Sequence, residues 1–204
     1  MSQYLNLEYM FLDGVGEFDI PEILPTYERP RVDQWIEFDY VKRSKKNRDR
    51  TGIHFFEYDC KFVRVWEQPT KYINLLSQFP LVLSPDFSMY TDFPKAVQIF
   101  NKYRNHWLAR YWQEQGLIVI PQIGWSTEDN WDWQFEGYPK HSIVAVSNVG
   151  CMREKESKQI FLKGYQEMLK RLEPSEILLF TKRFDHYDGP VTYVRHTMMK
   201  EEQR

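Results

Sequence analysis

Short, wholly apolar runs that alternate with amphipathic segments constrain the fold of this chain more than any other feature. The runs are Leu81–Leu83, Leu117–Ile120, Ile143–Val146 (in a strand expected from Ser142) and Ile177–Phe180. A run without polar alternation is typical of a strand that is covered on both faces. Between the runs, apolar residues recur at helical spacing over 69–78, 94–115 and 155–172. This alternation predicts βα units around a mostly parallel sheet.

The predicted fold class is therefore α/β, with one mostly parallel sheet of about four to six strands in a single domain. Residues 1–52 contain repeated Gly and Pro and keep no helical period, so they predict an irregular N-terminal extension that packs on the core. Residues 53–204 form the predicted α/β core, whose first strand is expected over 53–58. The helix over 94–115 is expected to bury the stripe Ala96, Ile99, Phe100, Tyr103, Trp107 and Tyr111.

Composition excludes several classes of protein. The 204 residues carry 27 Lys and Arg against 29 Asp and Glu, so a net charge of −2 creates no basic field for nucleic acid or anionic lipid. No apolar stretch reaches the roughly 18 residues of a membrane span, and no export signal opens the chain. We therefore expect a cytoplasmic protein that does not bind membranes. Two cysteines outside any C-x-x-C pair exclude a disulfide scaffold.

Polar side chains follow each predicted strand, where parallel sheets collect their ligands. The predicted ligand-binding residues are Asp86, Ser88, Asp92, Arg104, Gln122, Trp125, Ser147, Asn148 and Lys182. Asp86, Trp125 and Ser147 are expected on one edge of the sheet. Arg104 is expected to be largely buried and paired with Asp86 or Asp92. The alternative interpretation is that these residues only cap turns and helix starts, as residues after strands commonly do.

The sequence contains no recognised catalytic or metal-binding motif. Its five histidines have no H-x-H or H-E-x-x-H spacing, and no G-x-S-x-G elbow is present. The loop Ser147–Gly150 matches neither dinucleotide nor P-loop glycine patterns. We therefore predict no metal site and name neither a catalytic residue nor a cofactor, and whether the protein is an enzyme stays open.

Two further segments have alternative interpretations. The segment from Trp125 to Phe135 combines three tryptophans with acidic residues, and it either recognises a ligand or partner or packs on the chain's own core. The basic run Lys42–Arg50 is expected to be a surface loop with at most a weak, salt-sensitive affinity for nucleic acid.

Several blocks of residues 53–182 resemble a family of α/β proteins. The blocks are Leu83–Ser88 with Tyr90 and Asp92–Pro94, Tyr103–Asn105, Val119–Pro121 with Trp125, Gly137–Lys140, Val144–Gly150 and Phe161–Tyr165. They are similar to a domain-of-unknown-function family from Gram-positive bacteria, their phages and integrated mobile elements. The resemblance implies no particular reaction, and the first 50 residues fall outside it.

Two functions are compatible with these observations. The first is a phage- or mobile-element-type accessory protein whose polar pocket binds a nucleotide, a nucleic-acid end or a similar polar ligand. The second is a non-enzymatic interaction protein that redirects or inhibits a host or phage protein through an aromatic and acidic surface. An exposed patch at Trp131 and Trp133 would favour the second. The sequence does not indicate the oligomeric state.

Overall fold

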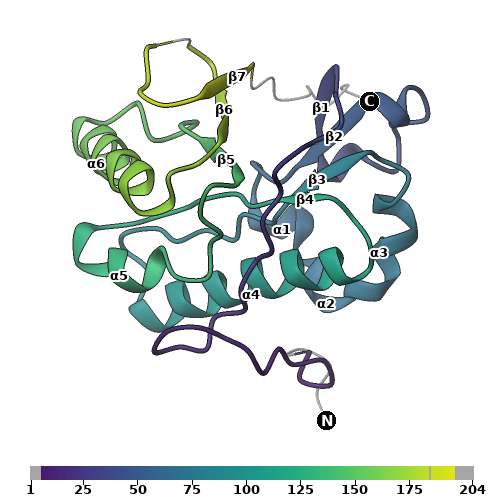
Figure 1. The fold of residues 1–204 in the computed structure, drawn as a ribbon, viewed down its shortest axis with the longest axis horizontal. Coiled ribbons are helices and arrows are strands. Elements are labelled where there is room, and N and C mark those ends of the chain that lie inside the picture. The colour runs from purple at the N-terminus through teal and green to yellow at the C-terminus, as the bar shows by residue number, and fades with distance from the viewer. Residues whose placement is uncertain (1–5, 184, 196–204) are drawn as a thin grey trace.

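Within the part of the chain that the structure describes, each strand pairs in parallel with its neighbours, and the strands of each sheet follow one another in chain order. The computed structural model describes residues 6–183 and 185–195 (Figure 1). The strands are β1 (Gln34–Glu37), β2 (Thr51–His54), β3 (Leu81–Leu83), β4 (Val119–Ile120), β5 (Ile143–Ser147), β6 (Glu176–Thr181) and β7 (Val191–Arg195). The helices are α1 (Asp59–Phe62), α2 (Arg64–Glu67), α3 (Pro69–Leu76), α4 (Lys95–Glu114), α5 (Trp131–Gln134) and α6 (Lys155–Leu172). Short 3-10 turns occupy Phe38–Tyr40, Arg48–Arg50 and Glu128–Asn130.

The strands form a sheet of four, β1 to β4, and a sheet of three, β5 to β7. A parallel bridge between Gln122 and Ala145 joins the two sheets. Around it, the Ala145 amide donates to the Pro121 carbonyl and the Ile123 amide donates to the Ala145 carbonyl, both at 2.8 Å. Connections between parallel strands are almost always right-handed, so strict chain order places the helices on one face, and the sheet curves around its other face as in a βα barrel. The predicted α/β class with parallel strands is confirmed.

The inner face of this curved sheet has an apolar core of its own. Its buried members alternate along the strands: Leu81, Leu83, Ile120, Ile143, Ala145, Leu178 and Phe180. The ring of Phe180 on β6 lies 5.1 Å from that of Trp35 on β1 and 4.8 Å from that of Phe56 beyond β2. Neighbouring strands are about 4.8 Å apart, so these strands could not touch in a flat sheet. The contacts show that β6 faces β1 and β2 across a nearly closed interior.

The N-terminal extension contributes more to the sheet than the sequence predicted. β1 lies within it and pairs in parallel with β2, which begins at Thr51 and not at Ile53. The irregular part, residues 6–33, is called the arm below. In Figure 1 the arm, in purple, passes the junction of the two sheets before it reaches β1. Thr26 joins the starts of the adjoining strands β4 and β5, since its hydroxyl donates to the Val119 carbonyl and its carbonyl accepts from the Ile143 amide.

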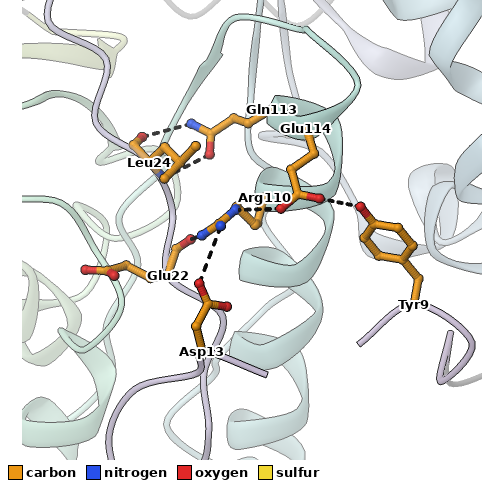
Figure 2. Close-up of polar contacts among 7 residues, drawn as sticks. All are labelled: Tyr9, Asp13, Glu22, Leu24, Arg110, Gln113 and Glu114. Atoms are coloured by element: carbon orange, nitrogen blue, oxygen red, sulfur yellow. Dashed lines mark hydrogen bonds and ion pairs between the residues drawn. The ribbon is translucent and has the colours of Figure 1, made fainter. Parts of the chain in front are cut away.

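Helix α4 holds the arm through its C-terminal half (Figure 2). Arg110 donates to the Glu22 carbonyl at 2.9 Å and forms an ion pair with Asp13. The Gln113 amide pairs with both the amide and the carbonyl of Leu24, at 2.9 and 2.8 Å. These contacts tie an irregular segment to a regular helix, which explains how it stays ordered without secondary structure.

The stripe predicted for α4 is wrong in the N-terminal half of the helix. Ala96 and Phe100 are exposed there. The buried residues over positions 95–106 are instead polar: Gln98, Asn101, Lys102, Asn105 and His106. Asn105 both accepts from the Phe87 amide and donates to the Phe87 carbonyl. The helix is turned this way because the loop after β3 has backbone groups that no strand satisfies, and the amide side chains supply the missing partners.

Candidate functional site

Polar side chains point inward at the carboxyl ends of the strands, a region called the mouth below. Side chains alternate along a strand, so the residue two positions after an inward one also points inward. Trp35, Ile120 and Ala145 belong to the inner core, which places Glu37, Gln122 and Ser147 at the mouth. His54 on β2 also faces inward, with its ring 5.3 Å from that of Phe180. The parallel strands therefore bring these polar groups to one edge.

Asp86 is the most distinctive group at the mouth. It follows β3, is half-buried, and its carboxylate makes no hydrogen bond or ion pair with residues 6–183 or 185–195. A methyl group placed on Gly124 would lie 3.8 Å from Asp86 Oδ1 and 3.6 Å from Gln122 Nε2, so both side chains flank this glycine. Burial, and then the charge of Asp59, raises the pKa of Asp86 to about 7. A carboxyl group with such a pKa can both donate and accept a proton near neutral pH.

The loop that carries Asp86 is pinned to the start of α1. Asp59 accepts hydrogen bonds from the Ser88 hydroxyl at 2.8 Å and the Ser88 amide at 3.1 Å. The Ser88 hydroxyl is therefore occupied by Asp59, where it anchors the loop, and it is not free to bind a ligand at the mouth. Asp92, further along the same loop, is exposed.

Arg104 lies beside this loop, but it lacks the predicted carboxylate pair. Its guanidinium stacks 3.6 Å from the centre of the Phe87 ring and donates to Asn101, and its buried Nε has no partner. Burial lowers the pKa of Arg104 to about 10, while Asp59 is the acid that acts in the opposite direction. The expected pairing with Asp86 or Asp92 is wrong because the guanidinium is occupied by the aromatic ring and an amide.

A second acidic group at the mouth was missed by the sequence analysis. Glu57 follows β2, accepts a hydrogen bond from the Asp39 amide at 3.1 Å, and keeps its buried Oε2 without a partner. Burial, the largest effect, raises the pKa of Glu57 to about 7. Buried Glu37 lies close enough to raise it further. The sequence does show that Glu57 is an acid near the end of a predicted strand. Because β1 was not predicted, nothing in the sequence placed Glu37 beside Glu57.

Three other predicted site residues lie away from the mouth. Trp125 has its ring 5.3 Å from that of Phe161, and its indole lies directly against Gly164 on α6, where a larger residue would collide with it. Asn148 is buried on the outer face and donates to the Tyr187 hydroxyl at 2.9 Å. Lys182 is exposed. Of the predicted set, Asp86, Gln122 and Ser147 lie at the mouth itself.

The tryptophan segment packs on the protein's own core. Trp131 and Trp133 are 8% and 6% exposed, and Phe135 is buried with them. The Trp131 indole donates to the Ser126 carbonyl at 3.2 Å. The exposed aromatic patch on which the interaction-protein hypothesis depended is therefore absent from this segment. Tryptophans this large are hidden because the segment forms α5 and folds against the core.

The basic run Lys42–Arg50 lies at the surface, as predicted. Two of its arginines have local partners: Arg48 donates to the Ser44 carbonyl at 2.6 Å, and Arg50 forms an ion pair with Asp33 at 2.7 Å. The run leads directly into β2.

Over residues 6–183 and 185–195, no cluster of three or more His, Cys, Asp or Glu side chains is arranged to hold a metal ion. Within the same ranges, no helix combines the length and the apolar character needed to cross a membrane.

An all-parallel βα sheet in chain order, with polar groups at its carboxyl edge, defines an open-barrel βα protein. The chain belongs to the family described as a domain of unknown function (DUF4417), which matches residues 12–197. The match includes the arm from residue 12 onward as well as β1, so the family domain begins well before residue 53.

Two phage proteins are similar to the chain over most of its length. It is 33% identical over 178 residues to the Gene 1 protein of Mycobacterium phage L5, covering 86% of the chain and 76% of that protein. It is 33% identical over 179 residues to the Gene 1 protein of Mycobacterium phage D29, covering 86% of the chain and 64% of that protein. The chain thus spans just under two thirds of the second relative. No solved structure matches it.

The raised pKa of Asp86 predicts a specific pH dependence of stability. Below about pH 4 the carboxyl is protonated in both the folded and unfolded states, and its contribution to stability is lost as the pH rises through 7. The difference in unfolding free energy between Asp86→Asn and the native protein should therefore be more favourable to the variant at pH 8 than at pH 4. We expect this change to be about 1–2 kcal/mol after allowance for solvent access. Urea unfolding of both proteins from pH 4 to 8 measures this, and parallel pH profiles would contradict the assignment.

Proposed function

We propose that this protein is a phage- or mobile-element-type accessory protein that binds a nucleotide or a similar polar ligand at the mouth. The half-buried Asp86 carboxyl, which lacks a hydrogen-bonding partner in the described chain, carries the proposal. Buried polar groups are normally satisfied, so a carboxyl left open at the carboxyl edge of a parallel sheet points to a ligand that supplies the donor.

The chemistry of the surrounding groups supports a ligand with both donors and acceptors. Asp86 offers an acceptor at neutral pH, and the Gln122 amide beside Gly124 offers both a donor and an acceptor. The guanidinium of Arg104 supplies positive charge at the same loop. A nucleobase presents N–H donors and ring acceptors on one edge, and its phosphate is an anion, so a nucleotide meets all three groups. A nucleic-acid end presents the same chemistry.

The proposal concerns binding, and no reaction is assigned to the mouth. The phage relatives support an accessory role, and residence in Gram-positive hosts and their mobile elements is part of the same proposal. Binding of a host or phage protein is not favoured at Trp131 and Trp133, because both are buried.

A thermal-shift screen tests the proposal. The full chain is heated with each ribonucleoside and deoxyribonucleoside mono- and triphosphate, and with a short single-stranded oligonucleotide. A ligand at 100 times its Kd should stabilise the folded protein by about 2.7 kcal/mol, a shift of several degrees. Asp86→Asn should abolish the shift, whereas Asp129→Asn, an exposed acid on the turn before α5, should keep it.

The outcomes separate the alternatives. A shift with a mononucleotide that depends on Asp86 supports the mouth as the site. A shift that appears only with the oligonucleotide and disappears when Lys45 and Lys46 are replaced by glutamine would move binding to the basic run. An absence of any shift across the whole panel would refute nucleotide binding.

A further inference from the structure

Three buried polar atoms without partners lie together behind the mouth. They are Lys102 Nζ, His106 Nε2 and Glu136 Oε2. Lys102 and His106 are completely buried and lie one helical turn apart on α4, so their side chains share one face of the helix. Glu136, from the segment after α5, is close enough for its charge to act on Lys102. Elsewhere in proteins such groups are satisfied, so the cluster calls for an explanation.

The hydrogen bonds fix the protonation of His106. Its Nδ1 lies 2.9 Å from the Pro21 carbonyl oxygen, which can only accept, so Nδ1 carries the proton. In the neutral ring Nε2 then holds a lone pair that faces the cluster. Burial, with the added effect of nearby Lys102, keeps the pKa of His106 well below its usual value.

Lys102 is held in surroundings that favour its neutral form. Its Nζ lies 3.5 Å from the centre of the Tyr138 ring, a contact that favours the ammonium, but it is fully buried and has no hydrogen-bond acceptor, which disfavours the charged form. Burial lowers the pKa of Lys102 well below that of an exposed lysine, although Glu136 acts in the opposite direction. A neutral amine has a free lone pair, which is what makes desolvated lysines nucleophilic.

The arm closes this cluster from outside. Gly16 packs directly on the Glu136 carboxylate, and Pro21 binds His106. The Ile23 amide donates to the Gly137 carbonyl at 2.9 Å, next to Glu136. Arg110 and Gln113 also fasten this part of the arm to α4, as Figure 2 shows, so the arm is held both by the Pro21–His106 contact and by side chains outside the cluster. Displacement of the arm would uncover Glu136 and His106, the two groups beside the amine.

The cluster also borders the mouth. The Tyr138 side chain, which covers Lys102, is hydrogen-bonded to the backbone of Gly124. Gly124 in turn adjoins Asp86. One aromatic ring thus separates the amine from the mouth.

We propose that Lys102 is the nucleophilic amine of a site for a small aldehyde or ketone, closed by the N-terminal arm. The Lys102 lone pair attacks the carbonyl carbon, and Glu136 and His106 relay one amine proton to the oxygen to give a neutral carbinolamine. They relay the second amine proton to the same oxygen, which leaves as water, and an imine forms between the carbonyl carbon and Nζ with no change of oxidation state. The inference is independent of nucleotide binding at the mouth.

Reductive trapping tests the inference on the full chain. Glyoxylate or pyruvate is added with sodium cyanoborohydride at pH 7, and the adducts are located by peptide mass spectrometry. We expect Lys102 to be labelled at least tenfold faster than any exposed lysine, since the exposed amines are protonated. Its rate should stay nearly flat from pH 7 to 9, whereas the rates of exposed lysines should rise about tenfold per unit. Arg110→Ala, which removes the contacts of α4 with Glu22 and Asp13 of the arm, should accelerate labelling of Lys102.

Matched variants complete the test. Lys102→Met removes the amine and keeps the apolar stem, so it should lose the fast adduct, whereas Lys163→Met, an exposed lysine on α6, should keep it. If Lys102→Met fails to fold, the adduct map and pH profile of the native chain still decide the question. Labelling confined to exposed lysines, in the native chain and in Arg110→Ala alike, would overturn the inference. The nucleotide screen stands or falls separately, because it uses different probes and a different residue.

Discussion

Phe180→Ala should lower the free energy of unfolding by about 3–5 kcal/mol, as other truncations of buried aromatic residues do. The Phe180 ring fills the interior of the curved sheet and contacts Trp35, His54 and Phe56. Its removal would leave a cavity where β6 faces β1 and β2, and the surrounding strands cannot collapse to fill it. Urea denaturation followed by circular dichroism measures the loss.

Two further substitutions calibrate this result. Phe180→Leu keeps most of the apolar volume and should cost less than about 1.5 kcal/mol. Tyr27→Ala, at an aromatic residue that is 67% exposed, should change stability by no more than about 0.5 kcal/mol. If Phe180→Ala were as mild as Tyr27→Ala, the interior would not be closed by this ring.

Trp131→Ala and Trp133→Ala should each destabilise the protein by about 3–5 kcal/mol. Both indoles are buried, and the Trp133 indole also donates to Asn130 at 3.2 Å. Thermal melts of the two variants test the expectation. Asp132→Asn is the matched control, because this residue lies between them with its side chain 95% exposed and should leave the melting temperature nearly unchanged. Near-normal melting of the tryptophan variants would restore the hypothesis of a recognition surface.

The fold class could be predicted from the sequence because its signals are local. The apolar runs at 81–83, 117–120 and 177–180 correspond to β3, β4 and β6, and the helical spacing over 94–115 and 155–172 corresponds to α4 and α6. A run that is apolar throughout can be buried only between two layers, which restricts the architecture to a covered parallel sheet. The alternation of strand and helix then gives the crossover connections.

β1 was not predicted because its signals are not local. Its sequence, Gln34-Trp35-Ile36-Glu37, carries polar residues at both ends and lies among prolines and charges, so it has no local signature of a buried strand. It becomes a strand because β2 offers an open edge and because Trp35 reaches the Phe180 ring from the far side of the sheet. Contacts between residues so distant in the chain leave no periodicity to detect.

The candidate site also has a part that the sequence predicts and a part that depends on tertiary contacts. The sequence by itself determined that polar residues follow the strands, and for Asp86, Gln122 and Ser147 that position decides where they lie, since parallel strands end at one edge. Only the tertiary structure decided which way the other side chains face: Trp125 turns to Gly164, Asn148 to Tyr187, and the polar face of α4 turns inward. The buried state of Lys102 and His106 depends on the arm and on Tyr138, which are distant in sequence. Burial sets the pKa of these groups, and it is a property of the whole fold that no local pattern encodes.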